Sequence, residues 1–229
     1  MTTPNPLSEL AMWEDWQEIV KRSLPNFCAS PIYVQQRSQS QEDFERTARY
    51  VAARGPIDIS GKTRDAEFGG LVRSTEACGP VTRMWLDSNV EYDFLHRHLP
   101  QLRRRSVIDI GAGYGRLAAS MSPLVDRYAC VDAVPISTEL CSKYLARFAS
   151  SVDVLSLDDY WASSVSADLA INIHSWNECS FVQVDRWLSD LSRRRIKFLF
   201  TVSNGHFTSG KSAYATWGGK GESFRPLLE

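Results

Sequence analysis

A glycine-rich turn after a short apolar segment contains the residues of this chain best suited to hold a ligand. Three of the five residues 111–115 are glycines, and they follow the apolar segment 106–110, in which Asp109 lies two residues before the first glycine. Glycines at this spacing allow a tight turn and a close approach of the backbone to a ligand. A helix that starts directly after the turn offers unpaired N–H groups. The segment therefore predicts a site for a nucleotide-like cofactor at the end of a strand.

The spacing of the turn and two acidic residues discriminate between cofactors. In a dinucleotide site, a third glycine stands where this chain has Arg116. Asp109 would repel a pyrophosphate but can accept a hydrogen bond from an ammonium group. Asp132 ends the next apolar segment, 128–132, where its carboxylate can chelate the hydroxyls of a ribose. These positions disfavour NAD and favour a cofactor that carries a cationic amino-acid part.

The turn and the following acid resemble the first motif of class I S-adenosylmethionine-dependent methyltransferases, in which an acid-x-Gly-x-Gly-x-Gly turn receives the methionine part of S-adenosylmethionine (SAM). The resemblance implies SAM as the cofactor. It also implies that the turn after the third strand lines the adenine, with Asp158 accepting a hydrogen bond from the exocyclic amine and Asp159 a candidate helix cap. The cofactor-binding residues implied in this way are Asp109, Gly111, Ala112, Gly113, Tyr114, Arg116, Asp132, Ala133, Leu157 and Asp158.

Polar residues also follow the segment 168–174, the fourth strand expected. His174 ends that strand next to the cofactor turn, where a neutral imidazole can act as a general base; a structural, hydrogen-bonded histidine is the alternative. Glu178 or Asn177 is placed to orient the imidazole ring or the acceptor. His206, directly after the fifth strand, is the reserve base.

Residues 88–95, 107–117 and 171–178 narrow the resemblance to the sugar O-methyltransferases of bacterial glycan and natural-product pathways, over about residues 80–205. This resemblance implies transfer of a methyl group from SAM to a hydroxyl of a sugar or a glycosylated small molecule. No cluster of carboxylates is visible, so no metal is expected. From their places after the fourth and fifth strands, the candidate catalytic residues are His174, Glu178 and His206, and the candidate substrate-binding residues are Trp176, Asn177 and Asn204.

Two other functions are compatible with the same motifs. One is a small-molecule N-methyltransferase, and the other is a catalytically silent SAM-binding subunit whose N-terminal helix docks on a partner. The second alternative accords with the absence of the family's final pair of strands, since only a glycine-rich segment and the short piece 223–228 follow Asn204. The chain is therefore expected either to be truncated or to complete its sheet edge in another way.

The order of the expected elements predicts an α/β fold, a doubly wound, Rossmann-like and mostly parallel sheet with helices on both faces. Such a sheet gathers ligands at the carboxyl ends of its strands, which is where the predicted site residues must lie. Residues 81–229 are expected to form the SAM-binding domain. The strands are expected at 106–110, 128–132, 152–155, 168–174 and 196–203, and the helices at 115–124, 137–149 and 181–192.

Residues 1–80 are expected to form a helical extension that packs over the carboxyl edge of the sheet as a lid. Trp13, Trp16 and Val20 recur at helical spacing and predict an amphipathic helix that ends near Pro25. Further along the chain, Ser88 and Glu91 have the spacing of a capping box and predict a helix that starts there and stops at Pro100.

Composition limits the possible partners and surroundings of the protein. The net charge of −1 over 229 residues provides no broad field for nucleic acid or an anionic membrane. The five cysteines are an odd number without a Cys-x-x-Cys pair, which favours a reducing cytoplasm and disfavours a zinc site. No signal peptide or membrane anchor is expected. The arginine triplets 103–105 and 193–195 are expected to face water at the opposite edge of the sheet. A small-molecule substrate and a possible homo-oligomer are the remaining partners.

Overall fold

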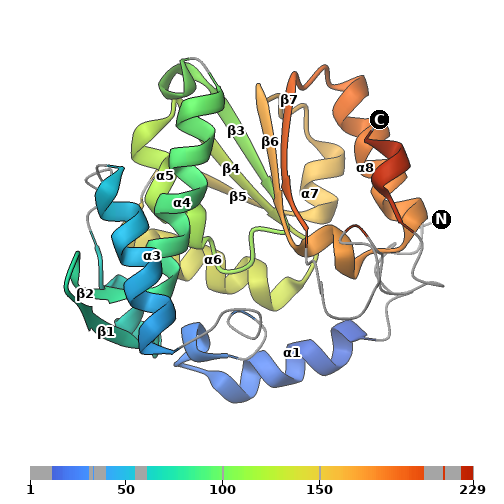
Figure 1. The fold of residues 1–229 in the computed structure, drawn as a ribbon. Coiled ribbons are helices and arrows are strands. Elements are labelled where there is room, and N and C mark those ends of the chain that lie inside the picture. The colour runs from blue at the N-terminus through green and yellow to red at the C-terminus, as the bar shows by residue number, and fades with distance from the viewer. Residues whose placement is uncertain are drawn as a thin grey trace.

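A five-stranded parallel sheet forms the centre of the computed structural model, which describes residues 12–30, 33, 40–54, 61–99, 101–149, 151–203, 214 and 223–228 (Figure 1). The strands are adjacent in the order β5-β4-β3-β6-β7, and every neighbouring pair is parallel. The predicted Rossmann-like α/β fold is therefore confirmed. The strands are β3 (Ser106–Ile110), β4 (Arg127–Asp132), β5 (Val152–Ser156), β6 (Leu169–Ile173) and β7 (Phe198–Val202).

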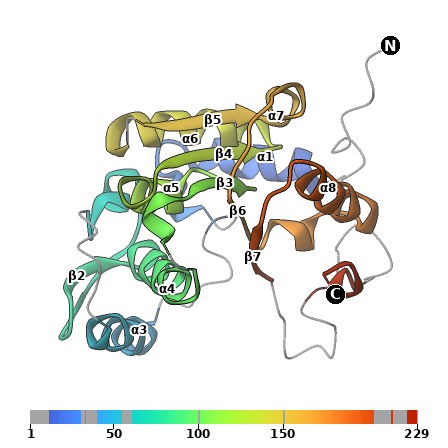
Figure 2. The same ribbon diagram turned by 90° about the horizontal axis from the view of Figure 1, so that it is seen from above.

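Helices cover both faces of the sheet because alternate residues of each buried strand point to opposite sides. Val107 of β3 packs in one cluster with residues of α5 (Arg116–Met121), α6 (Pro135–Phe148) and α4 (Arg83–His98). Ile108 and Ile110 pack on the other face against α7 (Leu157–Ala162) and α8 (Phe181–Arg193). Viewed from above, β3 and β6 lie between these two layers (Figure 2).

The described N-terminal elements lie in two different places. In Figure 1, α1 (Met12–Ser23) lies on the side where the strands end, whereas α3 (Gln41–Ala53) lies beside α4. Phe44 and Val51 of α3 pack against Trp85 and Leu86 of α4 in a separate apolar cluster. An antiparallel hairpin, β1 (Val72–Thr75) and β2 (Gly79–Thr82), replaces the helical structure expected before residue 80. The division into a lid and a SAM-binding domain stays a prediction.

The capping box predicted at Ser88 is wrong. Helix α4 begins at Arg83, and its cap is Thr82, whose hydroxyl accepts a hydrogen bond from the backbone N–H of Trp85 at 3.3 Å. Ser88 and Glu91 lie inside the helix and are buried. The helix starts one and a half turns earlier than expected because Trp85 and Leu86 bury apolar side chains against α3.

The cap of α7 is Ser156, since its hydroxyl accepts a hydrogen bond from the backbone N–H of Asp159 at 3.1 Å. Asp159, the predicted cap candidate, is therefore not the cap but supplies the backbone N–H from which Ser156 accepts this hydrogen bond. The side chain of Asp158 is exposed in the first turn of the same helix.

The two arginine triplets precede β3 and β7 at the amino edge of the sheet, as predicted, but Arg194 does not face water. Only 9% of its side chain is exposed, because the guanidinium bonds to Asp190 and to the carbonyl groups of Ser163 and Val165. Arg194 therefore satisfies, with buried hydrogen bonds, carbonyl groups at and after the C-terminal end of α7.

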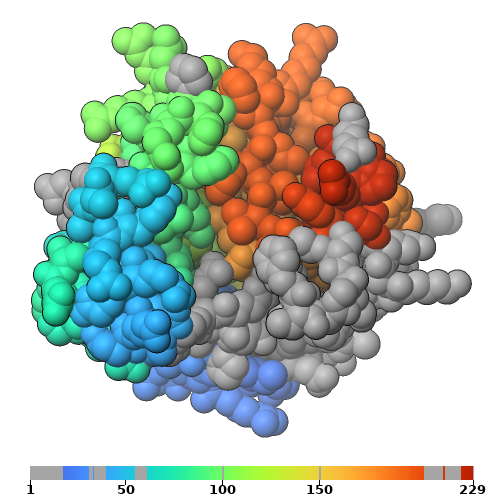
Figure 3. Space-filling view, viewed as in Figure 1, coloured from blue at the N-terminus to red at the C-terminus, as the bar shows by residue number. Residues whose placement is uncertain are grey.

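The described C-terminal residues pack against the α8 side of the molecule, seen in red in Figure 3 and well separated from α3. Phe224 is fully buried, with its ring centre 6.2 Å from that of Trp176 and 5.5 Å from that of Tyr214. Among the described helices, none combines the length and the apolar character that spanning a membrane requires.

Candidate functional site

A cavity opens at the carboxyl edge of the sheet, between the ends of β3, β4 and β6. All predicted cofactor contacts except Asp158 line it: Asp109, Gly111, Ala112, Gly113, Tyr114, Arg116, Asp132, Ala133 and Leu157. Asp158 lies outside the lining. The elements that the sequence predicts therefore bring the glycine turn and both acids to one place.

The glycine turn has to approach the end of β6 very closely. Gly111 has φ +73°, and a Cβ on it would lie 2.2 Å from the hydroxyl oxygen of Ser175. That hydroxyl donates to the carbonyl of Ile110 at 3.2 Å, and Asn172, which is 1% exposed, donates to the same carbonyl at 3.0 Å. Asn172 and Ser175 thus fasten the glycine turn to β6. The signal for Asn172 in the sequence is a polar residue inside an otherwise apolar strand.

Asp132 shapes the turn that it faces. One carboxylate oxygen accepts a hydrogen bond from the N–H of Gly113 and the other accepts one from the N–H of Val134, both at 2.8 Å. Burial raises the pKa of Asp132 to about 6, although these backbone donors act in the opposite direction. Each oxygen retains a second lone pair, so the carboxylate can still accept hydrogen bonds from hydroxyl groups of a ligand.

Asp109 is a buried acid in the floor of the cavity. Its carboxylate accepts a hydrogen bond from the hydroxyl of Tyr128 at 3.0 Å, and only 4% of the residue is exposed. Burial raises its pKa to about 7, against the lowering effect of the Tyr128 hydrogen bond. A cationic group bound beside it would favour its ionised form.

The segment after β6 brings His174, Trp176 and Glu178 to the cavity. His174 has φ +69°, a left-handed conformation that costs a non-glycine residue about 1 kcal/mol or more. Its N–H donates to the carbonyl of Val202 in β7 at 2.7 Å, which fixes the start of the segment. Asn177 is buried and lies outside the cavity lining.

Glu178 is an acid whose charge state is set by its surroundings. Burial, together with the negative charge of Asp132, raises the pKa of Glu178 to about 8. The carboxyl group is therefore mainly protonated at neutral pH and can donate a hydrogen bond.

Some predicted positions lie outside the described residues. Asn204 and His206 are among them, so their substrate-binding and catalytic roles stay predictions. Trp13 and Trp16 belong to α1, but their side chains lie outside the described part as well. Within the described residues, no group of three or more His, Cys, Asp or Glu side chains is arranged to hold a metal ion.

Several cavity residues carry no motif and were missed from the sequence. Tyr33 is one; its hydroxyl lies 3.1 Å from that of Ser137, and its ring centre lies 5.0 Å from that of Tyr114. Another group comes from α7 and α8, where Arg186 lies 4.7 Å from the centre of the Trp161 ring. Helical spacing could have linked Trp161 to Leu157, since residues four apart share a helix face. The lining residues missed in this way include Tyr33, Met84, Trp161, Gln183, Arg186 and Trp187.

No family model and no curated protein matches the chain. Similar solved structures include the PH0226 protein from Pyrococcus horikoshii OT3, with TM-score 0.43 and 15% identity, covering 68% of this chain and 66% of that one. Phosphoethanolamine N-methyltransferase 1 from Haemonchus contortus, in complex with phosphoethanolamine and S-adenosylhomocysteine, has TM-score 0.39 and 15% identity, covering 75% and 33%. An S-adenosylmethionine-dependent methyltransferase from Mesorhizobium loti has TM-score 0.36 and 15% identity, covering 51% of each chain.

The chain spans less than two thirds of the length of each of these three structures. At such low identities and TM-scores, the matches identify neither the activity nor the ligand of this chain.

Proposed function

We propose that this chain binds SAM and is a SAM-dependent methyltransferase. The observation that carries the proposal is the meeting of the glycine turn, Asp109 and Asp132 in one cavity at the carboxyl edge of a parallel sheet. This is the edge at which doubly wound folds bind their ligands. A buried acid next to a glycine turn suits a ligand with a cationic amino-acid end better than a pyrophosphate.

The residues fit the three parts of SAM. Asp109 would accept a hydrogen bond from the ammonium group, and the free lone pairs of Asp132 would accept those of the ribose hydroxyls. Leu157, which lines the cavity and is 7% exposed, would provide an apolar wall for the adenine. The exposed side chain of Asp158 is a weaker candidate for the adenine amine than the sequence suggested, because it does not line the cavity.

The acceptor chemistry is proposed from the end of β6. When bound, SAM supplies an electrophilic methyl group on a sulfonium. His174, as general base, would take the proton of the acceptor hydroxyl as its oxygen gains the methyl group, and such a base contributes roughly 10²- to 10⁴-fold to the rate. The protonated carboxyl group of Glu178 would donate a hydrogen bond that orients the acceptor, and Trp176 would form part of the wall.

The proposed acceptor is a hydroxyl of a sugar or a glycosylated small molecule. Mass spectrometry of candidate acceptors incubated with SAM and the protein tests this directly. The expected result is a gain of one methylene unit on a sugar oxygen. A gain on an amine would replace the O-methyltransferase by an N-methyltransferase, and SAM binding without transfer to any acceptor would favour the silent subunit.

A further inference from the structure

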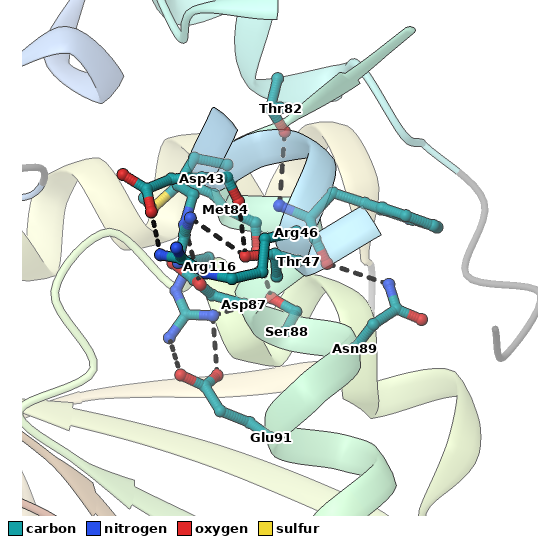
Figure 4. Close-up of polar contacts among 12 residues, drawn as sticks. Asp43, Arg46, Thr47, Thr82, Met84, Asp87, Ser88, Asn89, Glu91 and Arg116 are labelled. Atoms are coloured by element: carbon teal, nitrogen blue, oxygen red, sulfur yellow. Dashed lines mark hydrogen bonds and ion pairs between the residues drawn. The ribbon is translucent and has the colours of Figure 1, made fainter. Parts of the chain in front are cut away.

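The guanidinium of Arg116 is held by helix α4. One terminal nitrogen donates to Glu91 at 2.7 Å and to Ser88 at 2.9 Å, and the other donates to Glu91 at 3.0 Å. Figure 4 shows the guanidinium facing the Glu91 carboxylate with both bonds parallel. The side chains of Arg116 and Glu91 are only 13% and 10% exposed. A paired, two-bond contact of this kind fixes direction as well as distance.

Arg116 directly follows the cofactor turn, so this contact fixes the position of the turn. Gly115, the residue before it, has φ +84° and caps α5, and a Cβ there would lie 2.9 Å from the sulfur of Cys141 in α6. The end of the turn is therefore packed against α6 and tied to α4. A turn held in this way needs little rearrangement when a ligand binds, which lowers the entropic cost of binding.

Helix α4 also contributes to the cavity itself. Met84 lines the cavity, and the hydroxyl of Ser88 donates to the carbonyl of Met84 at 2.9 Å. The same hydroxyl receives the hydrogen bond from Arg116. Ser88 therefore connects one wall of the cavity with the cofactor turn.

We propose that Glu91 and Ser88 are positioning residues that hold the cofactor turn in its binding geometry through Arg116. This inference rests on the proposed function, because SAM is the ligand that the turn would receive. It also gives Arg116 a role other than the cofactor contact predicted from the sequence.

The charges of the pair act on the buried acid of the same cavity. The groups facing Asp109 are the hydroxyl of Tyr128 and the carboxylate of Asp132 from β4, the guanidinium of Arg116 from α5 and the carboxylate of Glu91 from α4. Arg116 lowers the pKa of Asp109 and Glu91 raises it. Removing the charge of Glu91 leaves the charge of Arg116 without its partner, so Asp109 should ionise at a lower pH.

Calorimetric titration of Glu91→Gln with S-adenosylhomocysteine (SAH) across pH tests the inference. Well above pH 7, where Asp109 is ionised in both proteins, the looser turn should weaken binding by about 5- to 10-fold. The pH at which half of the affinity is lost should also move to a lower value than in the parent. A residue with a purely structural role would not move this midpoint.

Asp190→Asn is the matched control, because it neutralises another buried carboxylate paired with an arginine. Asp190 and Arg194 are 3% and 9% exposed and lie outside the cavity lining. This variant should lower the Tm and leave both the SAH affinity and its pH midpoint unchanged. If the control weakens SAH binding as much as Glu91→Gln does, the effect reflects general destabilisation and the inference is overturned.

Two further variants keep the test decisive should Glu91→Gln fail to fold. Arg116→Lys retains the charge but loses the paired contact, and we expect about 3- to 5-fold weaker SAH binding. Ser88→Ala removes the third bond to Arg116 together with the bond to the Met84 carbonyl and leaves the Glu91 contact intact, and we expect about 2-fold weaker binding. Parental SAH affinity together with a parental pH midpoint in folded Glu91→Gln would overturn this inference but not the proposed function. Parental SAH affinity in both Arg116→Lys and Ser88→Ala would do the same. Absence of SAH binding by the parent would instead overturn the proposed function.

Discussion

A buried arginine–carboxylate pair stands at each edge of the sheet, and the two pairs have different roles. At the amino edge, Arg194 joins Asp190 to the carbonyl groups that end α7, and it lies outside the lining of the cavity described above. At the carboxyl edge, Arg116 joins Glu91 to a turn that lines this cavity. The difference follows from the direction of the strands, because helices end at the amino edge and begin at the carboxyl edge. The same interaction completes the fold at one edge and holds a cavity-lining turn at the other.

The acids at the two edges differ as well. At the carboxyl edge, burial raises the pKa values of Asp109, Asp132 and Glu178. At the amino edge, the backbone N–H of Ser106 lowers the pKa of Asp168. Buried acids with raised pKa values that share a cavity are a sign of a functional site, whereas a hydrogen-bonded surface acid stabilises the fold.

The largest effect is expected from His174, which can be compared with Arg195 because both have left-handed backbones, φ +69° and +58°, at opposite edges. Asparagine tolerates this conformation, so His174→Asn should fold and bind SAH. Turnover measured with an accepted substrate should fall about 100- to 1000-fold because the proposed general base is lost. Arg195→Asn should turn over at the parental rate. Near-parental turnover in His174→Asn would show that His174 is not the general base.

A second comparison sets Gly111 against Gly79, whose φ values of +73° and +70° are alike. A Cβ on Gly111 would meet Ser175 at 2.2 Å, whereas a Cβ on Gly79 would meet nothing within 4 Å. Gly111→Ala should therefore weaken SAH binding by roughly 100-fold, and Gly79→Ala should lower the Tm alone. Equal SAH affinities in the two folded variants would show that the close approach of the turn to β6 is not needed.

The buried acids at the carboxyl edge should affect SAH binding and protein stability in opposite directions as the pH changes. The proposed function requires Asp109 and Asp132 to bind the ligand as carboxylates, so affinity should fall about 10-fold as pH decreases through about 7 and about 6. Because both pKa values are raised in the fold, their contribution to unfolding free energy is complete below the ordinary carboxyl pKa and is lost as pH rises through about 6 and 7. Asp168, with a lowered pKa, contributes stability that is lost as pH falls. Thermal unfolding across pH, with and without SAH, measures both trends; a rise of affinity on acidification would contradict the assigned roles.

The smallest effects on SAH affinity are expected from two neighbouring residues at the carboxyl edge, Leu157 and Asp158. Leu157 lines the cavity and Asp158 does not. Leu157→Ala should weaken SAH binding by about 10-fold through lost apolar contact, while Asp158→Asn should change it less than about 2-fold because the side chain is exposed. A larger effect of Asp158 in calorimetric titration would restore its predicted contact with the adenine.

The sheet and the cofactor turn could be predicted from the sequence because their signals are local. The apolar segment 106–110, the glycines of 111–115 and the acid at Asp132 lie in one strand–turn–helix–strand unit, and their spacing fixes the register. The start of α4 was misplaced because Ser88 and Glu91 match a capping box by spacing, whereas their partner, Arg116, is distant in sequence.

The other walls of the cavity could not be predicted for the same reason. Tyr33, Met84 and Arg186 reach it from three separate elements, and no short motif records such long-range contacts. The hairpin β1–β2 was missed because its pairing depends on packing beside α3 and α4 as well as on its own short strands. Local patterns thus predicted one edge of the site, and tertiary packing determined the rest.

Calorimetric titration of the unmodified protein with SAH tests the central claim most directly. The turn, Asp109 and Asp132 line one cavity, so we predict saturable binding of one SAH per chain. A titration with NAD at the same concentration should give no heat of binding. Binding should be weakened roughly 100-fold in Gly111→Ala and kept in Gly79→Ala. A folded protein that takes up no SAH, or that binds NAD instead, would contradict the assignment of this edge of the sheet as a SAM site.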